Sequence, residues 1–161
     1  MHIELKQVTR QYDERLKPVL ENLSLTVADG SSVAITGPSG SGKSTLLNLI
    51  GTLDFPTTGT VLLNGISTGS LKPDALANIR NTELGFVFQT HLLLPQLSLI
   101  ENVLLPVLPL TRDRRIAART RALQLLDRVG LGGKSSRLPG ALSVGECQRG
   151  AVVRALINQP S

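Results

Sequence analysis

The chain has 161 residues, of which 41% are hydrophobic and 18% charged, and its formal net charge is +5. This composition excludes an intrinsically disordered chain and fits about one globular domain, with a surface charge that permits anionic partners without requiring them. Aromatic residues are only 2%, which argues against a base-stacking surface for single-stranded nucleic acid, and a lone cysteine, Cys147, excludes an intrachain disulfide or a cysteine zinc site.

Alternating apolar residues predict two strands at the start of the chain, over residues 3–8 and 19–27. An Asp-Gly turn at 29–30 follows. The β-rich run 32–36 then predicts a short buried strand, and the apolar residues behind the next glycine-rich stretch predict a helix over 43–51. This order is typical of an α/β protein.

The middle of the chain continues with short elements. Residues 54–59 predict a turn, 60–63 a strand, and 73–80 a short helix with a proline in its first turn. Residues 84–88 predict a further strand that places Gln89 at its end.

Residues 92–110 are the most apolar stretch of the chain. A membrane-spanning helix is not expected there, because a lone helix so interrupted could not satisfy its backbone in lipid. We expect a loop and a short helix, partly exposed as a contact surface for an apolar partner. The interrupting residues are Pro95, Gln96, Glu101, Asn102, Pro106 and Pro109.

Two helices are predicted in the last third. The first, over 112–129, is rich in arginine, which favours a solvated face, and its expected apolar side carries Ile116, Leu123, Leu126 and Val129. The second begins near 142 and ends near Leu156. Ser143 is placed to cap it, and Glu146, three residues later, completes a capping box.

The stretch 37–45, G-P-S-G-S-G-K-S-T, matches the phosphate-loop pattern G-x-x-x-x-G-K-[ST]. Its glycines allow the backbone amides to converge on a phosphate, and the following helix adds its positive dipole end. Lys43 would reach the β- and γ-phosphates of a nucleotide, and the Ser44 hydroxyl would ligate Mg²⁺. The loop alone does not separate kinases, GTPases and motor ATPases.

With these residues placed, the chain resembles the nucleotide-binding domain of ATP-binding cassette (ABC) transporters. Tyr12 matches the aromatic residue that stacks on adenine, residues 37–45 match the Walker A loop, and Gln89 matches the glutamine that contacts Mg²⁺ and senses the transmembrane partner. Residues 142–149, L-S-V-G-E-C-Q-R, match the signature sequence, with Val144 standing where the family has its first signature glycine.

The resemblance implies a site set and a fold. The fold is an α/β P-loop NTPase (RecA-like) core with an N-terminal antiparallel β-subdomain and an inserted helical subdomain. The predicted blocks are 1–91 for the β-subdomain and P-loop core, 92–155 for the helical subdomain with the signature, and 156–161 for the return to the core. The implied ATP ligands are Tyr12, Gly37, Pro38, Ser39, Gly40, Ser41, Gly42, Lys43, Ser44, Thr45 and Gln89, with Ser44 and Gln89 also on Mg²⁺. The signature residues that would act on a second subunit's ATP are Ser143, Val144, Gly145 and Glu146.

Within the family, residues 84–106 and the Gly-Thr-Leu-Asp run at 51–54 are similar to the ATPases of the lipoprotein-releasing and macrolide-exporter group. The resemblance implies an ATPase subunit that pairs with a second copy, binds a membrane permease at the cytoplasmic face, and contacts no nucleic acid. The family would continue past Ser161 into its Walker B strand and switch histidine, so no catalytic residue is assigned, and we expect the 161-residue chain to be impaired in hydrolysis. Two alternatives stay open: a soluble ABC-type ATPase acting on DNA, and a non-catalytic nucleotide-binding remnant.

Overall fold

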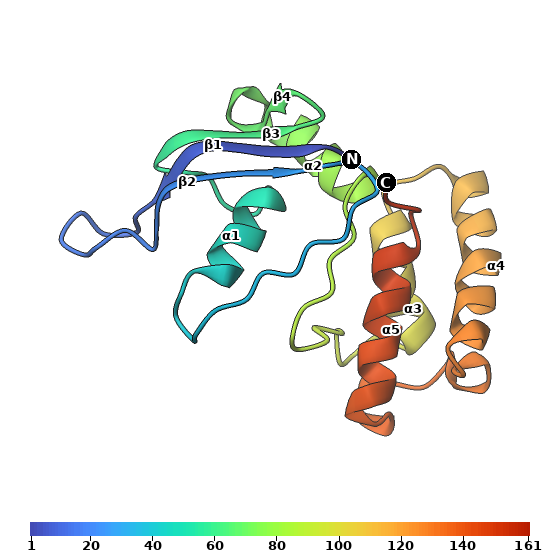
Figure 1. Ribbon diagram of the computed structural model, residues 1–161. Coiled ribbons are helices and arrows are strands. Elements are labelled where there is room, and N and C mark those ends of the chain that lie inside the picture. The colour runs from blue at the N-terminus through green and yellow to red at the C-terminus, as the bar shows by residue number, and fades with distance from the viewer. The chain divides into compact units, whose positions relative to one another are not determined.

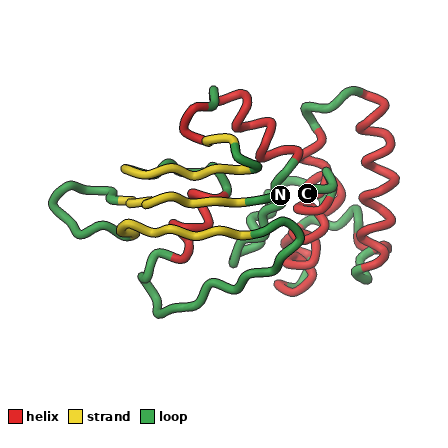
Figure 2. The backbone as a smooth tube through the Cα atoms, turned by 45° about the horizontal axis from the view of Figure 1, so that its top comes forward, coloured by secondary structure: helices red, strands yellow, loops and turns green.

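The computed structural model describes residues 1–161 and divides them into two compact units, Met1–Arg80 and Asn81–Ser161. Figure 1 labels the elements along the chain, and Figure 2 separates strands from helices by colour. The strands are β1 Ile3–Arg10, β2 Leu20–Val27, β3 Thr58–Leu63 and β4 Ile66–Ser67. The α-helices are α1 Lys43–Ile50, α2 Pro73–Thr82, α3 Leu99–Leu104, α4 Arg112–Arg128 and α5 Val144–Leu156, and single 3-10 turns cover Thr68–Ser70, Leu105–Val107, Gly132–Lys134 and Pro139–Ala141.

The first unit is built on an antiparallel sheet with the strand order β2-β1-β3-β4. The central strand β1 pairs on one side with β2, Leu5 opposite Leu25, and on the other with β3, Leu5 opposite Val61. Figures 1 and 2 show β2, β1 and β3 lying side by side. The predicted N-terminal antiparallel subdomain is therefore confirmed, and β3 starts two residues earlier than its sequence pattern indicates.

An irregularity in β1 decides which side chains enter the core of this unit. Leu5 and Val8 are three residues apart, which in a regular strand would place them on opposite faces. The register shifts between them, and Gln7 adopts a left-handed φ of 49°. Both side chains are consequently buried, together with Leu46 and Leu49 of α1, in one apolar cluster. Helix α1 is thus fixed against the sheet, which positions the glycine-rich loop that precedes it.

The second unit is helical. Its apolar core joins α3, α4 and α5 through fully buried side chains such as Leu99, Leu126 and Val153. Gly150 allows the close approach of α5 to α3, because a Cβ there would lie 2.5 Å from Leu99 Cδ1. Burial of these aliphatic side chains stabilises the unit by roughly 1.5–3 kcal/mol for each fully buried one.

Asn102 explains how the apolar stretch 92–110 folds. Its side chain is buried, receives a hydrogen bond from Leu94 N at 2.7 Å and donates to the carbonyls of Leu94, Leu97 and Ser98. The stretch forms a loop, α3 and a 3-10 turn, as predicted. None of the helices in the structure is long and apolar enough to cross a membrane.

Two predicted strands are absent. Residues 32–36 and 84–88 have no regular secondary structure, and the side chains of Val33 and Val87 are 53% and 49% exposed. A strand of a parallel sheet is held by ladder bonds to neighbouring strands, and no strand in the structure pairs with either segment. The β-propensity of these runs does not by itself supply the neighbouring strands that a sheet requires.

The predicted apolar side of α4 is also partly wrong. Leu126 is fully buried, but Ile116 and Leu123 are exposed, and Ala122 takes the other fully buried position on the helix. The small Ala side chain marks where the helix packs most closely, whereas the bulkier Ile116 lies near the N-terminal end and faces solvent.

Candidate nucleotide-binding site

The glycine-rich loop 37–42 leads directly into α1. Gly40 and Gly42 have left-handed φ values of 81° and 85°, and Gly37 has φ 153°. At Gly42 a Cβ would lie 2.8 Å from the Val19 carbonyl oxygen, so both the backbone angle and the space require glycine. The glycines thus give the loop a backbone course that lets its amides approach a ligand closely.

The beginning of α1 has no side-chain cap. Gly42 occupies the N-cap position and makes no side-chain hydrogen bond, and no acidic residue stands in the first turn. The first-turn amide groups therefore lack the side-chain acceptor that caps most helices. Such a helix start favours an anionic ligand through its amides and its dipole.

Lys43 folds back over this loop. Its Nζ donates hydrogen bonds to the carbonyl oxygens of Gly37 at 2.9 Å and Pro38 at 2.6 Å. The ammonium group is thereby held beside the uncapped helix start, where it adds a full positive charge. Ser44 follows in the first turn with an exposed hydroxyl, and Thr45 is buried in the sheet-facing side of the helix. The donor set of cation, amides and hydroxyl fits a phosphate with a bound Mg²⁺.

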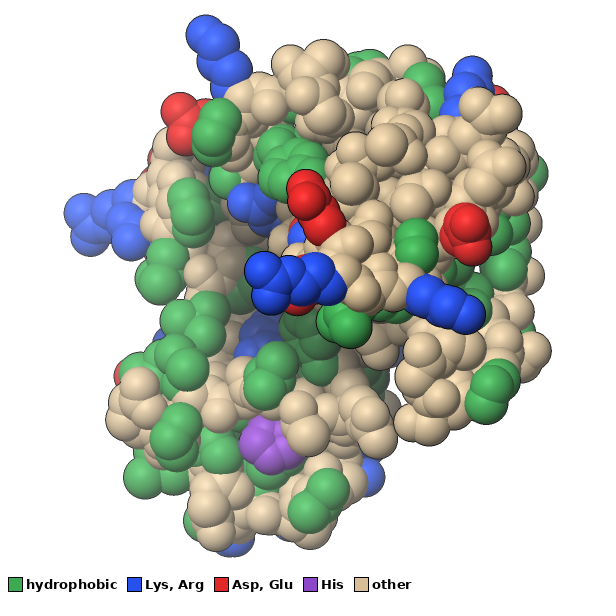
Figure 3. All heavy atoms as spheres, turned by 90° about the vertical axis from the view of Figure 1, so that its left-hand side faces the viewer, with side chains coloured by type: hydrophobic (Ala, Val, Ile, Leu, Met, Phe, Trp, Pro, Cys, Tyr) green, Lys and Arg blue, Asp and Glu red, His purple; other side chains and the backbone are tan.

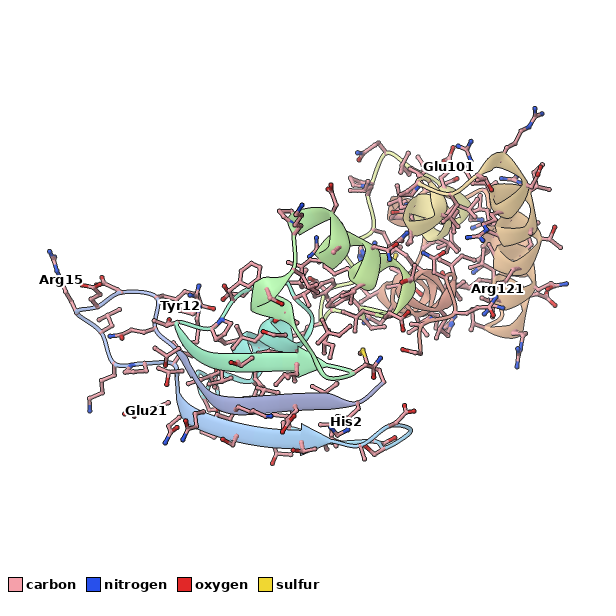
Figure 4. All side chains as sticks on the ribbon, turned by 90° about the horizontal axis from the view of Figure 1, so that it is seen from above. His2, Tyr12, Arg15, Glu21, Glu101 and Arg121 are labelled. Atoms are coloured by element: carbon pink, nitrogen blue, oxygen red, sulfur yellow. The ribbon has the colours of Figure 1, made fainter.

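Tyr12 lies in the same unit, in the loop between β1 and β2, and is 57% exposed. Figure 4 shows it at the end of the sheet, at the base of the loop whose tip carries Arg15. The Arg10 guanidinium stacks on one face of the ring at 4.3 Å from its centroid. The Tyr12 hydroxyl donates to Asp54 Oδ2 at 3.0 Å. A ring so held leaves one face for a flat aromatic group.

Helix α5 begins with a complete capping box, as predicted. Ser143 Oγ accepts from Glu146 N at 3.3 Å, and Glu146 Oε2 accepts from Ser143 N at 2.9 Å. The other carboxylate oxygen of Glu146 forms an ion pair with Lys134. The hydrogen bond from Lys134, followed by that from Ser143 N, lowers the pKa of Glu146 to about 2. Both carboxylate oxygens of Glu146 are therefore engaged, one by the start of α5 and the other by Lys134.

Val144, which departs from the signature pattern, is accommodated without backbone strain. It is the first residue of α5, its φ is not positive, and its side chain is 79% exposed. Ser143 and Gly145 beside it are also exposed. The helix start thus keeps its geometry with valine, and the difference from glycine is an isopropyl group projecting into solvent.

Gln89 is exposed in a bend, and α5 holds the segment that contains it. Gln148 Nε2 donates to Phe88 O at 2.9 Å. Six residues further along α5, the Arg154 guanidinium donates to Leu92 O at 2.6 Å and His91 O at 2.8 Å, and burial lowers the pKa of Arg154. These bonds make residues 88–92 and α5 one structural group within the second unit.

The structure thus gathers the predicted residues into two groups. Tyr12 and residues 37–45 belong to the first unit, and Gln89 and the signature residues to the second. Sequence reasoning missed Arg10 and Asp54 as neighbours of Tyr12. The only available signal was the position of Arg10 two residues before the lone tyrosine, because Asp54 is 42 residues away in sequence.

On the face drawn in Figure 3, Lys and Arg side chains are scattered among other groups and form no continuous basic patch.

Comparison with known proteins identifies relatives of the chain. Residues 20–161 match the ABC transporter family. The chain is 48% identical over 160 residues to the lipoprotein-releasing system ATP-binding protein LolD of Shewanella frigidimarina, covering 98% of this chain and 66% of that protein. It is 50% identical over 143 residues to the uncharacterized ABC transporter ATP-binding protein YvrO of Bacillus subtilis, covering 89% and 62%.

Solved structures agree as well. The dimeric structure of MJ0796, a bacterial ABC transporter cassette, superposes with a TM-score of 0.88 at 43% identity, over 98% of this chain and 70% of that one. A second dimeric structure of MJ0796, in a post-hydrolysis state bound to ADP and Pi, gives a TM-score of 0.83 at 39% identity, with the same coverage of both chains. The chain belongs to the ABC transporter family, with the cassette fold that its motifs imply. It spans less than two thirds of the length of the two curated relatives named above.

Proposed function

We propose that the chain binds Mg-ATP as part of an ABC transporter ATPase subunit, and that this subunit drives release or export of lipoproteins. The observation that carries the proposal is the start of α1. There a glycine N-cap leaves the first-turn amides without a side-chain acceptor, and Lys43 Nζ is held over the loop by Gly37 and Pro38. The likeness to LolD over nearly the whole chain supports the choice of lipoproteins as the transported class.

The residue roles follow from the chemistry of each group. The backbone amides of residues 39–45 would hold the β-phosphate, and Lys43 would offset the charge of the β- and γ-phosphates. Ser44 would supply a hydroxyl to Mg²⁺, with Gln89 as a further ligand. Tyr12 would stack its open ring face on adenine. Bound Mg²⁺ would neutralise charge that develops on the phosphates during transfer to water.

We further propose two protein partners. A second copy of the cassette would receive Ser143, Val144 and Gly145 against the ATP on its phosphate loop, because an exposed helix start with a serine hydroxyl can contact an anion. The dimeric state of the MJ0796 cassette supports this pairing. Membrane permease subunits, contacted at the cytoplasmic face, would complete the transporter.

Glu146 is not expected to contact that ATP, although the resemblance included it. Both of its carboxylate oxygens are engaged, one by Ser143 N and the other by Lys134. A negative group there would also repel phosphate. We therefore propose that Glu146 shapes the helix start, and that Ser143 and the first-turn amides make the contact.

Two measurements test the proposal. Isothermal titration of the chain with Mg-ATP should show binding, and no detectable heat or saturation would contradict the nucleotide site. Expressed in a cell that contains a matching permease, the complete subunit should co-purify with membranes and release phosphate from Mg-ATP. Release without membrane association would favour the alternative ATPase acting on DNA, and binding without release would favour the non-catalytic remnant.

A Ser143→Arg substitution tests the pairing in the complete subunit. The bulky cation should leave Mg-ATP binding to one copy unchanged, because Ser143 belongs to the second unit and the phosphate loop to the first. It should block ATP-driven dimerisation, because Ser143 is exposed at the start of α5, where the second copy would bind. Sedimentation in the presence of Mg-ATP measures the dimer. Thr120→Arg, an equal change at an exposed position of α4 in the second unit, is the matched control. An intact ATP-dependent dimer in the Ser143→Arg protein would contradict the proposed role.

A further inference from the structure

The ring of Tyr12 is fixed by two side chains from other parts of the first unit. Arg10, at the end of β1, covers one ring face with its guanidinium. Asp54, in the turn behind α1, accepts the hydrogen bond of the phenol. Without these contacts a tyrosine in an exposed loop would move among several rotamers.

Arg10 and Asp54 are themselves firmly paired. Arg10 Nη2 lies 2.8 Å from Asp54 Oδ1, and Arg10 Nε donates to Asp54 Oδ2 at 2.9 Å. The two side chains are only 22% and 19% exposed. A two-point contact between a planar guanidinium and a carboxylate fixes direction as well as distance. The remaining polar contact of the Asp54 carboxylate is with Phe55 N, which donates to Oδ1 at 2.8 Å.

This cluster is also attached to the helix that follows the phosphate loop. The amides of Leu53 and Asp54 donate to Asn48 O, near the end of α1, at 2.9 and 3.3 Å. On the other side, Gln11 N donates to Thr57 Oγ1 at 3.1 Å, next to Tyr12. Hydrogen bonds thus join the cluster around Tyr12 to both ends of the turn that follows α1. A ligand with phosphates at the start of α1 would find an aromatic group whose position is set by that same helix.

We propose that Arg10 and Asp54 are positioning residues that hold Tyr12 as a preformed platform for a purine base. The inference rests on the proposed nucleotide site and extends it to two residues that touch no phosphate. Arg10 occupies one ring face, so only the other face is available, and the hydrogen bond to Asp54 sets the rotation of the ring. Preorganisation of this kind reduces the ordering cost of binding.

Tyrosine fluorescence reports on the platform directly, because Tyr12 is the only tyrosine and the chain has no tryptophan. A carboxylate hydrogen-bonded to a phenol quenches its emission. Asp54→Asn removes this carboxylate and should therefore raise the emission. Both Asp54→Asn and Arg10→Leu should lower the anisotropy of the emission in the nucleotide-free chain. Arg15→Leu removes the same charge from the tip of the same loop and should change neither. Equal emission and equal anisotropy in all four proteins would contradict the proposal that these contacts fix the Tyr12 ring.

Nucleotide binding tests what the platform does. Arg10→Leu and Asp54→Asn should each weaken Mg-ATP binding by about two- to fivefold, the size of an exposed cation–π contact. Inorganic tripolyphosphate, which has no base, should bind all variants as it binds the wild type. Arg10→Lys, which keeps the charge but not the two-point contact, should recover part of the affinity. Equal losses for ATP and tripolyphosphate would mean that the pair only stabilises the unit, and the proposal would be wrong.

A double-mutant cycle makes the assignment specific. In a Tyr12→Ala background, Arg10→Leu should cause no further loss of ATP affinity, because its effect passes through the ring. A loss that persists in that background would show that Arg10 acts on the nucleotide by another route. Failure of the platform and failure of the nucleotide site give different results. A wild-type chain that binds ATP no better than tripolyphosphate would refute the platform alone. A chain that binds neither compound would refute the proposed function.

Discussion

Helices α1 and α5 both begin at a segment expected to meet phosphate, yet they begin in opposite ways. Helix α1 has a glycine N-cap, no acidic residue in its first turn and a lysine held beside it. Helix α5 has a serine N-cap, a full capping box and Glu146 in its first turn. One helix start is open and positively charged, and the other already carries its own carboxylate.

The difference bears on when each helix start can hold an anion. The amides at the start of α1 lack a side-chain acceptor, so a phosphate there gains amide bonds, the helix dipole and the Lys43 charge together. At α5 the box satisfies two backbone donors, and Glu146 partly neutralises the dipole. We therefore expect α1 to bind phosphate within one copy, and α5 to add a contact only when a second copy brings the phosphate to it.

The largest expected effect is the loss of the charge at α1. Lys43→Ala should reduce Mg-ATP affinity by about 2–3 kcal/mol, since a charge-assisted contact to the phosphates disappears. Titration calorimetry measures this, with Lys134→Ala, a change of equal charge near α5, as the control. Equal affinities for the wild type and Lys43→Ala would refute the assignment of α1 as the open site.

Gly42→Ala should destabilise the first unit by more than the usual cost of a left-handed alanine, about 1–2 kcal/mol. The added Cβ would lie 2.8 Å from Val19 O and 2.9 Å from Leu20 Cδ2. Gly30→Ala is the matched control, because Gly30 has a φ of 69° and no atom within 4 Å of its added Cβ. Thermal unfolding by circular dichroism compares the two, and equal shifts in Tm would show that the close approach at Gly42 is unimportant.

Ser143→Ala should remove the cap of α5 and lower the free energy of unfolding by about 1 kcal/mol. The affinity of a single copy for Mg-ATP should remain that of the wild type. Urea unfolding gives the first quantity and calorimetry the second. Ser135→Ala, at the end of a neighbouring 3-10 turn, should have little effect on either. A Ser143→Ala protein as stable as the wild type would remove the contrast between the two helix starts.

The smallest effect concerns pH. The pKa of Glu146 is lowered from 4.5 to about 2 by its bonds to Lys134 and Ser143. A carboxyl with a depressed folded pKa stabilises the fold above its unfolded pKa, and this contribution is lost as pH falls toward the folded value. Glu146→Gln should therefore lower Tm near pH 6 and make little difference near pH 2. Glu14→Gln, in the exposed loop between β1 and β2, provides the comparison, and a Tm difference for Glu146→Gln that is independent of pH would contradict the ion pair.

The sequence was most informative where structure depends on neighbours in the chain. The helix after the phosphate loop and the capping box at Ser143 follow from residues within one or two turns, and both are confirmed. The strands expected at 32–36 and 84–88 failed because a parallel strand depends on ladder partners from elsewhere. The Tyr12 cluster was missed for a similar reason, because Asp54 is brought next to Tyr12 by the pairing of β1 with β3 and not by closeness in the sequence.

Side-chain hydrogen bonds join helix α5 to the segment 88–92 at two points. Gln148 holds Phe88 O, and Arg154 holds His91 O and Leu92 O, about 9 Å further along the helix axis. Because two attachments fix the direction of the segment on the helix, we expect a displacement of Gln89 to be accompanied by a rotation of α5. Such coupling is reciprocal, so a partner that binds the C-terminal end of α5 should also displace the segment that carries Gln89.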